Sequence, residues 1–176
     1  MRDIIYDVAV SLDGYIAAKG GDASAFPHTG DHADAYGERL QTYDTVIMGR
    51  KTYEYGYDFG LPPGARAYPE MAHYIFSKSL VLPDNPDVRA VRNNWLGKID
   101  ALKSETGGSI YLCGGGIFAG FLMQNGRVDL LRLKVAPLVL GCGIKLFEGL
   151  TKPIPTRLIT SRPYENGVVY QEHATR

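Results

Sequence analysis

One segment, from Thr45 to Tyr53, constrains what this chain can fold into more than any other. An apolar run stops at a glycine, and two cations and a hydroxyl follow immediately. The residues are Val46, Ile47, Met48, Gly49, Arg50, Lys51 and Thr52. This order predicts a buried strand that ends at the glycine and passes directly into a helix. The first turn of such a helix has unpaired N–H groups, which together with these side chains favour an anionic ligand.

A second junction of the same kind lies between Ile110 and Phe118. A short apolar run leads into Gly114, Gly115 and Gly116, and an apolar helix pattern follows. Parallel strands of one sheet place their carboxyl ends, and the helix starts that follow them, along one edge. Two junctions at one edge predict a ligand with more than one phosphate group, and a dinucleotide is the first candidate. The spacing is not Gly-x-Gly-x-x-Gly, so a standard Rossmann domain is not indicated.

Composition limits the classes of function. The chain has 176 residues, which fits one domain over 1–176, and its 19 basic and 19 acidic residues cancel. No overall basic field therefore indicates nucleic acid or a membrane surface as a partner. Only Cys113 and Cys142 occur, far apart, which predicts neither a disulfide framework nor a metal site. The sequence has no signal-peptide pattern and no apolar run of about 20 residues, so we expect a cytoplasmic protein.

The order of elements predicts an α/β fold. Apolar or alternating segments predict strands, and segments with helical spacing lie between them. The expected strands are 4–10, 45–48, 73–77, 88–91, 110–112, 128–135, 144–147, 156–160 and 167–172. The expected helices are 32–42, one that begins at 50, 95–105 and one that follows 114–116. Strands and helices alternate in the first two thirds, which predicts a mostly parallel sheet, and the strand-rich last third predicts an antiparallel edge.

Ser77 and Lys78 follow the strand expected at 73–77. A hydroxyl and an ammonium at that edge suit the extra phosphate that distinguishes NADPH from NADH. The alternative for this pair is a solvated strand end. Each glycine junction has a similar alternative, because a tight turn alone can require glycine.

Four segments resemble one superfamily. Met48–Glu54 resembles the signature that opens a cofactor-binding helix in dihydrofolate reductases, and Tyr111–Gly116 resembles their second glycine-rich cofactor segment. Ser11–Ala17 and Val128–Phe147 are similar to the reductase domain of riboflavin biosynthesis and its small stand-alone bacterial relatives. These segments cover almost the whole chain in the order of the family.

The resemblance implies a dihydrofolate reductase-like fold, a mixed sheet flanked by helices that binds NADPH across its strand ends. It implies contacts to the phosphates, to the adenosine 2′-phosphate, to the pyrophosphate and to the nicotinamide. The phosphate contacts fall on Gly49, Arg50, Lys51 and Thr52, and the contacts to the 2′-phosphate fall on Ser77 and Lys78. The pyrophosphate contacts fall on Gly114, Gly115, Gly116, Ile117 and Phe118. The nicotinamide contacts fall on Ile16 and Ala17. It also implies a homodimer that forms through the C-terminal part, with Val128–Leu140 as the seam.

The substrate half matches neither named enzyme. Riboflavin-pathway reductases carry a glutamate directly before the double glycine, and this chain has Cys113 there. Asp13 ends the first strand beside the implied nicotinamide and is the first candidate to orient substrate or relay a proton. Its alternative is a turn aspartate that bonds its own backbone before Gly14. Asp34 is a second candidate, with an exposed helical carboxylate as its alternative.

Two functions follow from these observations. The first is an NADPH-dependent oxidoreductase that reduces a small planar heterocycle, pyrimidine- or pterin-like, and resembles 5-amino-6-(5-phosphoribosylamino)uracil reductase. The alternative is a non-catalytic accessory or sensor protein that binds NADPH or another nucleotide. Hydride transfer needs little covalent help from the protein, so the cofactor is better predicted than the substrate.

Overall fold

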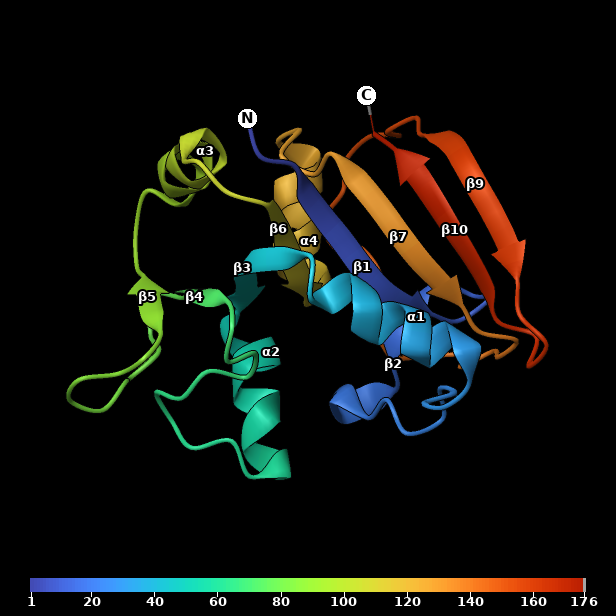
Figure 1. Cartoon of the computed structure of the whole chain (residues 1–176), viewed down its shortest axis with the longest axis horizontal. Helices are drawn as coiled ribbons and strands as arrows, with labels where there is room; N and C mark the ends of the chain where they lie inside the picture. The colour runs from blue at the N-terminus through green and yellow to red at the C-terminus, as the bar shows by residue number, and fades with distance from the viewer. Residues whose placement is uncertain (176) are drawn as a thin grey trace.

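The computed structural model describes residues 1–175, in which one eight-stranded sheet forms the centre (Figure 1). In sheet order the strands are β5 (Arg89–Val91), β4 (Ala72–Phe76), β3 (Tyr43–Gly49), β6 (Ser109–Gly114), β1 (Ile4–Val10), β7 (Leu130–Val135), β10 (Val169–Ala174) and β9 (Arg157–Pro163). Neighbouring strands from β5 to β7 are parallel, whereas β10 pairs antiparallel with both β7 and β9. This confirms the mixed, mostly parallel sheet with an antiparallel C-terminal edge.

Helices cover both faces of the sheet. They are α1 (Asp31–Leu40), α2 (Arg50–Tyr55), α3 (Trp95–Ser104) and α4 (Gly116–Gln124). Side chains alternate along a strand, so Ile4 and Tyr6 of β1 pack with α3 and α4, whereas Ile5 joins the opposite core with α2. In Figure 1, α1 crosses in front of β1 and α4 lies behind the sheet. Each fully buried aliphatic side chain in these cores contributes about 1.5–3 kcal/mol.

The segment expected to be a loop between the first strand and α1 contains short elements. β2 (Tyr15–Ala17) pairs with β8 (Ile144–Lys145) in a second, two-stranded sheet, and η1 (Lys19–Gly21) is a 3-10 turn. A second 3-10 turn, η2 (Gly56–Phe59), extends α2. A three-residue strand has too few positions to show a periodicity, and the partner of β2 lies far away in the sequence.

Residues 143–148, which we call the clasp, bind three parts of the chain together. The N–H of Leu146 donates to the carbonyl of Gly14 at 2.9 Å, and the N–H of Glu148 donates to the carbonyl of Gly116 at 3.0 Å. A Cβ at Gly116 would lie 2.1 Å from the Lys145 carbonyl oxygen, so only glycine permits this approach. The clasp therefore lies directly against the first turn of α4.

The implied dimer seam does not lie at a free edge. β7 has β1 on one side and β10 on the other, so both of its backbone edges are paired. The strand that ends the sheet on the side of β7 is β9, whose residues are all exposed. Dimerisation stays a prediction. Among residues 1–175, no helix combines the length and the apolar character needed to cross a membrane.

Candidate functional site

The two glycine junctions meet at the carboxyl edge of the sheet. β3 and β6 are parallel neighbours, so Gly49 and Gly114 end adjacent strands. A Cβ at Gly115, whose φ is +39°, would lie 3.0 Å from Oγ1 of Thr52. Because the side chain of Thr52 stands against the backbone of Gly115, the first turns of α2 and α4 lie side by side. The sequence prediction that the junctions share one edge is confirmed.

The cations after Gly49 lie on the surface of this edge. Lys51 is exposed, and Arg50 is half-buried and lies 3.5 Å from Glu54 one turn later. Neither cation is buried in a strong ion pair, so both can turn toward a ligand. Their position next to Gly115 is consistent with a role in balancing phosphate charge.

Ser77 and Lys78 differ from one another. The buried hydroxyl of Ser77 accepts hydrogen bonds from the N–H groups of Ser79 and Leu80, at 3.1 and 3.0 Å. The Ser77 hydroxyl thus stabilises a local turn and is not part of a solvated strand end, and its role toward a 2′-phosphate stays a prediction. Lys78 is exposed and can reach solvent beside the same edge.

The residues after the second junction have separate structural tasks. Phe118 is buried in the core, where its ring stacks on Phe76 with centroids 4.7 Å apart. Ile117 is 64% exposed. Gly116 admits the clasp, as described above. Gly115 is thus the glycine whose backbone faces the other junction, and the side chain of Phe118 is not oriented toward a ligand at this edge.

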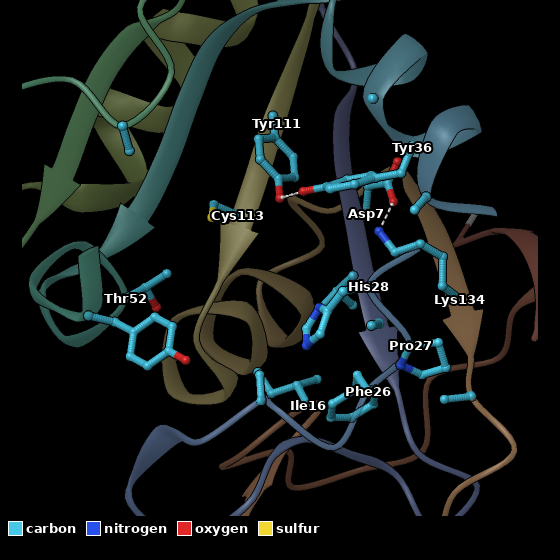
Figure 2. A pocket seen from close by; sticks show the side chains of 18 of the residues that line it. Asp7, Ile16, Phe26, Pro27, His28, Tyr36, Thr52, Tyr111, Cys113 and Lys134 are labelled. Carbon is cyan, nitrogen blue, oxygen red and sulfur yellow. Dashed lines mark hydrogen bonds and ion pairs between the residues drawn. The ribbon is translucent and has the colours of Figure 1, made fainter. Parts of the chain in front are cut away.

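A cavity of about 600 Å³ lies between α1, α2 and the sheet. Ile16, Thr52 and Cys113 line it near the glycine junctions (Figure 2). Asp7 and Lys134 line it at the other end, below α1. Ala17, by contrast, is buried in the pairing of β2 with β8 and is not among the lining residues.

Helix α1 forms one wall of this cavity. Ala33 and Tyr36 lie on the face that helical spacing predicts to be inward, and both line the cavity. They are only half-buried. The apolar stripe of α1 therefore faces a binding space rather than a close-packed core.

The floor of the cavity contains a buried ionic cluster. Nζ of Lys134 lies 2.8 Å from Oδ1 of Asp7, and Nε of Arg39 lies 2.8 Å from Oδ2. The side chain of Asp7 is fully buried. Two cations share one carboxylate, so the three residues carry one net positive charge.

A second group of polar side chains, Tyr43, Arg132 and Glu172, lies behind this cluster. The Tyr43 hydroxyl donates to Oδ2 of Asp7 at 3.3 Å and accepts from Arg132 at 3.0 Å. Arg132 also pairs with Glu172 at 2.8 Å. Its charge is therefore balanced away from the cavity, and Lys134 is the cation of this group that faces the cavity.

Burial and charge shift the pKa values of the cluster. Burial alone would raise the pKa of Asp7, but Lys134 and Arg39 together lower it below the usual carboxyl value. Burial lowers the pKa of Lys134, and the attraction of Asp7 offsets this only in part. Asp7 is thus held ionised, whereas the Lys134 ammonium gives up its proton more readily than an exposed lysine.

Tyrosine hydroxyls and a thiol complete the polar wall. The hydroxyl oxygens of Tyr36 and Tyr111 are 2.6 Å apart, and the Tyr68 hydroxyl lies 3.5 Å from Sγ of Cys113 (Figure 2 shows the tyrosine pair). Burial raises the pKa of Tyr36, Tyr111 and Cys113. These groups stay protonated near neutral pH and act as hydrogen-bond donors. Cys113 therefore contributes a protonated thiol to the cavity wall, at the position where the family pattern has a glutamate.

The two predicted catalytic carboxylates lie away from the cavity. Asp13 is exposed, and it accepts hydrogen bonds from the Ser11 hydroxyl and from the N–H groups of Leu140 and Gly141, at 2.6, 3.1 and 2.7 Å. Asp13 thus holds a distant loop through its carboxylate, a structural role that differs from the local turn given as its alternative. Asp34 is exposed on α1. Neither is among the residues that line the cavity.

Asp7 and Lys134 are the residues that the sequence analysis missed. A signal for Asp7 was present, because a carboxylate interrupts an otherwise apolar run at 4–10. Lys134 belongs to the polar half of the alternation at 128–135, which reads as a solvated face, yet it is only 7% exposed. That face of β7 lies under α1.

Fold and site together define an α/β domain with a cavity at the carboxyl edge of a mixed sheet. The sequence model of the RibD C-terminal domain family matches residues 2–170, and the chain belongs to this family. It is 31% identical to the uncharacterized protein YwjB of Bacillus subtilis strain 168 over 99% of this chain and 98% of that protein.

Two solved structures have the same fold. A putative riboflavin biosynthesis protein from Shewanella sp. PV-4 superposes with a TM-score of 0.82 at 21% identity, over 99% of this chain and 98% of that one. A diaminohydroxyphosphoribosylaminopyrimidine deaminase/5-amino-6-(5-phosphoribosylamino)uracil reductase from Thermotoga maritima superposes with a TM-score of 0.70 at 16% identity. There the match covers 98% of this chain and 56% of the larger protein.

Proposed function

We propose that the protein is an NADPH-dependent reductase of a small planar heterocycle, pyrimidine- or pterin-like. The observation that carries this proposal is one cavity that extends from Thr52 and Cys113 at the glycine junctions to Asp7 and Lys134 under α1. One end can receive a nicotinamide and the other a flat ring, which places a hydride donor next to an acceptor.

The chain offers suitable groups for NADPH. Gly115 has no side chain and lies against the Thr52 hydroxyl, so backbone N–H groups of the first turn of α4 stay approachable beside a donor. Arg50, Lys51 and Lys78 would balance the phosphate charges from the surface of the edge. When bound, NADPH supplies a hydride from its nicotinamide ring.

Lys134 is the group we assign as proton donor. A ring that accepts a hydride at carbon needs a proton at the neighbouring nitrogen, and the Lys134 ammonium lines the space where that ring would lie. Loss of this proton takes the group of Asp7, Lys134 and Arg39 from one net positive charge to zero. Asp7 keeps Arg39 as its partner, so the amine that remains leaves no buried carboxylate unpaired. Water then returns the proton.

Binding tests the cofactor. Titration with NADPH and NADH, followed by nicotinamide fluorescence, should show NADPH bound more tightly. A preference for NADH, or no binding of either, would contradict the proposal.

Turnover separates the reductase from the accessory or sensor protein. NADPH oxidation is measured against dihydropterins, dihydrofolate and ribosylaminopyrimidines. A reductase oxidises NADPH with at least one of them, and Lys134→Gln slows that reaction. An accessory or sensor protein binds NADPH and oxidises none.

A further inference from the structure

We infer that the substrate end of the cavity takes an uncharged planar ring without a phosphate group. This inference rests on the proposed function and concerns the substrate class of the same site. Three observations carry it: the pairing of the charges in the wall, the chemistry of the remaining wall, and the cluster of hydroxyl donors within it.

The charges in the wall are already paired. Among the described residues that line the cavity, Asp7 and Lys134 are the carboxylate and the ammonium, and they bond each other at 2.8 Å. The Lys134 Nζ also lies 3.4 Å from the ring centre of Tyr36. Arg39 is directed at Asp7 from the side of α1 and is not among the lining residues. A phosphate dianion would therefore meet a single net positive charge, and the one cation that lines the cavity already bonds a buried carboxylate.

The imidazoles of the cavity do not alter this balance. His32 is buried, and its ring nitrogens lie 3.1 Å from the Pro27 carbonyl oxygen and 2.9 Å from Nδ2 of Asn166. His28 also lines the cavity and is exposed (Figure 2). One exposed imidazole is a weak substitute for the two or more cations that hold a phosphate group in proteins.

The rest of the wall suits a flat ring. Phe26, Tyr36, Met48 and Tyr111 supply aromatic and apolar surface around the ion pair. Such surface stabilises a heterocycle by stacking and burial but leaves a phosphate without its hydration.

Hydroxyl donors are available for the edge of such a ring. The hydroxyl oxygens of Tyr36 and Tyr111 are 2.6 Å apart, in a cluster with the Tyr68 hydroxyl and the Cys113 thiol, and a hydroxyl of this cluster can turn to donate to a ligand instead. A ring carbonyl or ring nitrogen is the acceptor that fits this donor. The Thermotoga maritima protein carries a phosphoribosyl group in the name of its substrate. The wall of this cavity indicates a substrate that lacks that phosphate.

Two matched pairs of compounds test the inference. They are 5-amino-6-ribosylaminouracil with its 5′-phosphate, and dihydroneopterin with its 3′-phosphate. Calorimetry with the full-length protein in saturating NADP⁺ measures their affinities while the cofactor phosphate sites are filled. We expect the uncharged member of at least one pair to bind about tenfold or more tightly than its phosphate.

Three outcomes would overturn the inference: equal affinities within a pair that binds, tighter binding of the phosphate, or no binding by any of the four compounds. The cofactor claim has its own measurement in the NADP⁺ titration. A failed titration contradicts the proposed function, and the four compounds are then compared without NADP⁺. The two failures are thus distinguishable.

Variants locate the preference in the cavity. Asp7→Asn leaves two cations without their carboxylate. We expect the affinity for the phosphorylated compounds to rise about tenfold relative to that for the uncharged ones. If that variant does not fold, Ala33→Arg adds a cation at the α1 wall and should act in the same direction. If the folded variant leaves the preference unchanged, the charge argument is wrong.

Tyr36→Phe tests the hydroxyl donor. This variant should lower the affinity for the uncharged compound about three- to tenfold. Tyr74→Phe is the matched control, because that buried hydroxyl bonds Arg89 at 2.6 Å in the core on the other face of the sheet. Equal effects of the two variants would remove the assigned role of Tyr36.

Discussion

Lys134 and Asp7 meet diagonally across two parallel strands. The register places Asp7 opposite Arg132 and places Lys134 opposite Ala9, yet Nζ of Lys134 reaches Oδ1 of Asp7 at 2.8 Å. A directly opposite lysine would lie alongside the carboxylate. The diagonal position lets the long side chain of Lys134 cross the cavity floor before it meets Asp7, so the ammonium lines the cavity while it bonds the carboxylate.

Loss of the Lys134 ammonium should slow turnover. We expect Lys134→Gln to lower kcat about 10²- to 10⁴-fold, the usual contribution of a general acid, and to leave the Kd for NADPH unchanged. Because burial lowers the pKa of Lys134, wild-type kcat should fall as the pH rises through that lowered value. Stopped-flow and steady-state rates over a pH series measure both effects. Lys152→Gln, at an exposed lysine, is the control. An unaltered kcat in Lys134→Gln would end the assignment.

Asp7 should dominate stability in acid. Burial tends to raise its pKa, but Lys134 and Arg39 lower it overall, so its contribution is complete above the unfolded carboxyl pKa of about 4 and is lost as the pH falls through the folded value. Asp7→Asn should cost about 3–5 kcal/mol at neutral pH, because it leaves buried cations unpaired. The variant should also lose less stability than the wild type on acidification.

Urea unfolding at several pH values measures this. Asp34→Asn, at an exposed position on α1, should change stability by no more than about 0.5 kcal/mol. If Asp7→Asn and the wild type lose stability in parallel on acidification, the ion pair is not the cause.

The absence of a side chain at Gly115 should favour the binding of NADPH. A Cβ there would lie 3.0 Å from Oγ1 of Thr52, so Gly115→Ala pushes the two junctions apart. We expect an affinity for NADPH about tenfold lower, which corresponds to about 1.4 kcal/mol. Gly60→Ala is the control, because Gly60 also has a positive φ but a Cβ added there would have nothing within 4 Å. Equal Kd values for the two variants would show that backbone strain alone decides the effect.

Gly120 and Gly37 should respond to alanine with opposite signs. A Cβ at Gly120 would lie 1.9 Å from the Glu148 carbonyl oxygen in the clasp, whereas Gly37 in α1 has open space around it. Gly120→Ala should destabilise the fold by about 1–3 kcal/mol. Gly37→Ala should stabilise it by about 0.5–1 kcal/mol, since alanine is the better helix former. Urea midpoints with an unchanged m-value measure both, and a stable Gly120→Ala would show that the clasp can move.

Local patterns were sufficient to predict the main sheet. The central strands β1, β3, β4 and β6 are short apolar runs, and Gly49 and Gly114 end two of them. The order of these strands along the chain and the edge where the junctions meet therefore follow from residues close in sequence. The pairing of β2 with β8 did not follow, because it joins segments more than a hundred residues apart and neither is long enough to show a period.

The glycine junctions could be predicted from the sequence for the same reason, whereas the cavity floor could not. Thr52 and Gly115 belong to motifs that can be read in sequence. Asp7 and Lys134 become a pair only through the register of β1 with β7, which no local pattern of charge reveals. Asp13 illustrates the converse, because a strand-end carboxylate typical of catalysis is here bonded to Leu140 and Gly141 of a remote loop.

The clasp carries a consequence for how this chain can change its length. It is held at Gly14 after β1 and at the first turn of α4, so one short stretch sets the distance between the end of β1 and the start of α4. An inserted or deleted residue within 143–148 would shift both anchor points at once. Length variation among related chains should therefore concentrate elsewhere, as in the exposed stretch 83–87, where no such double anchor exists among the described contacts.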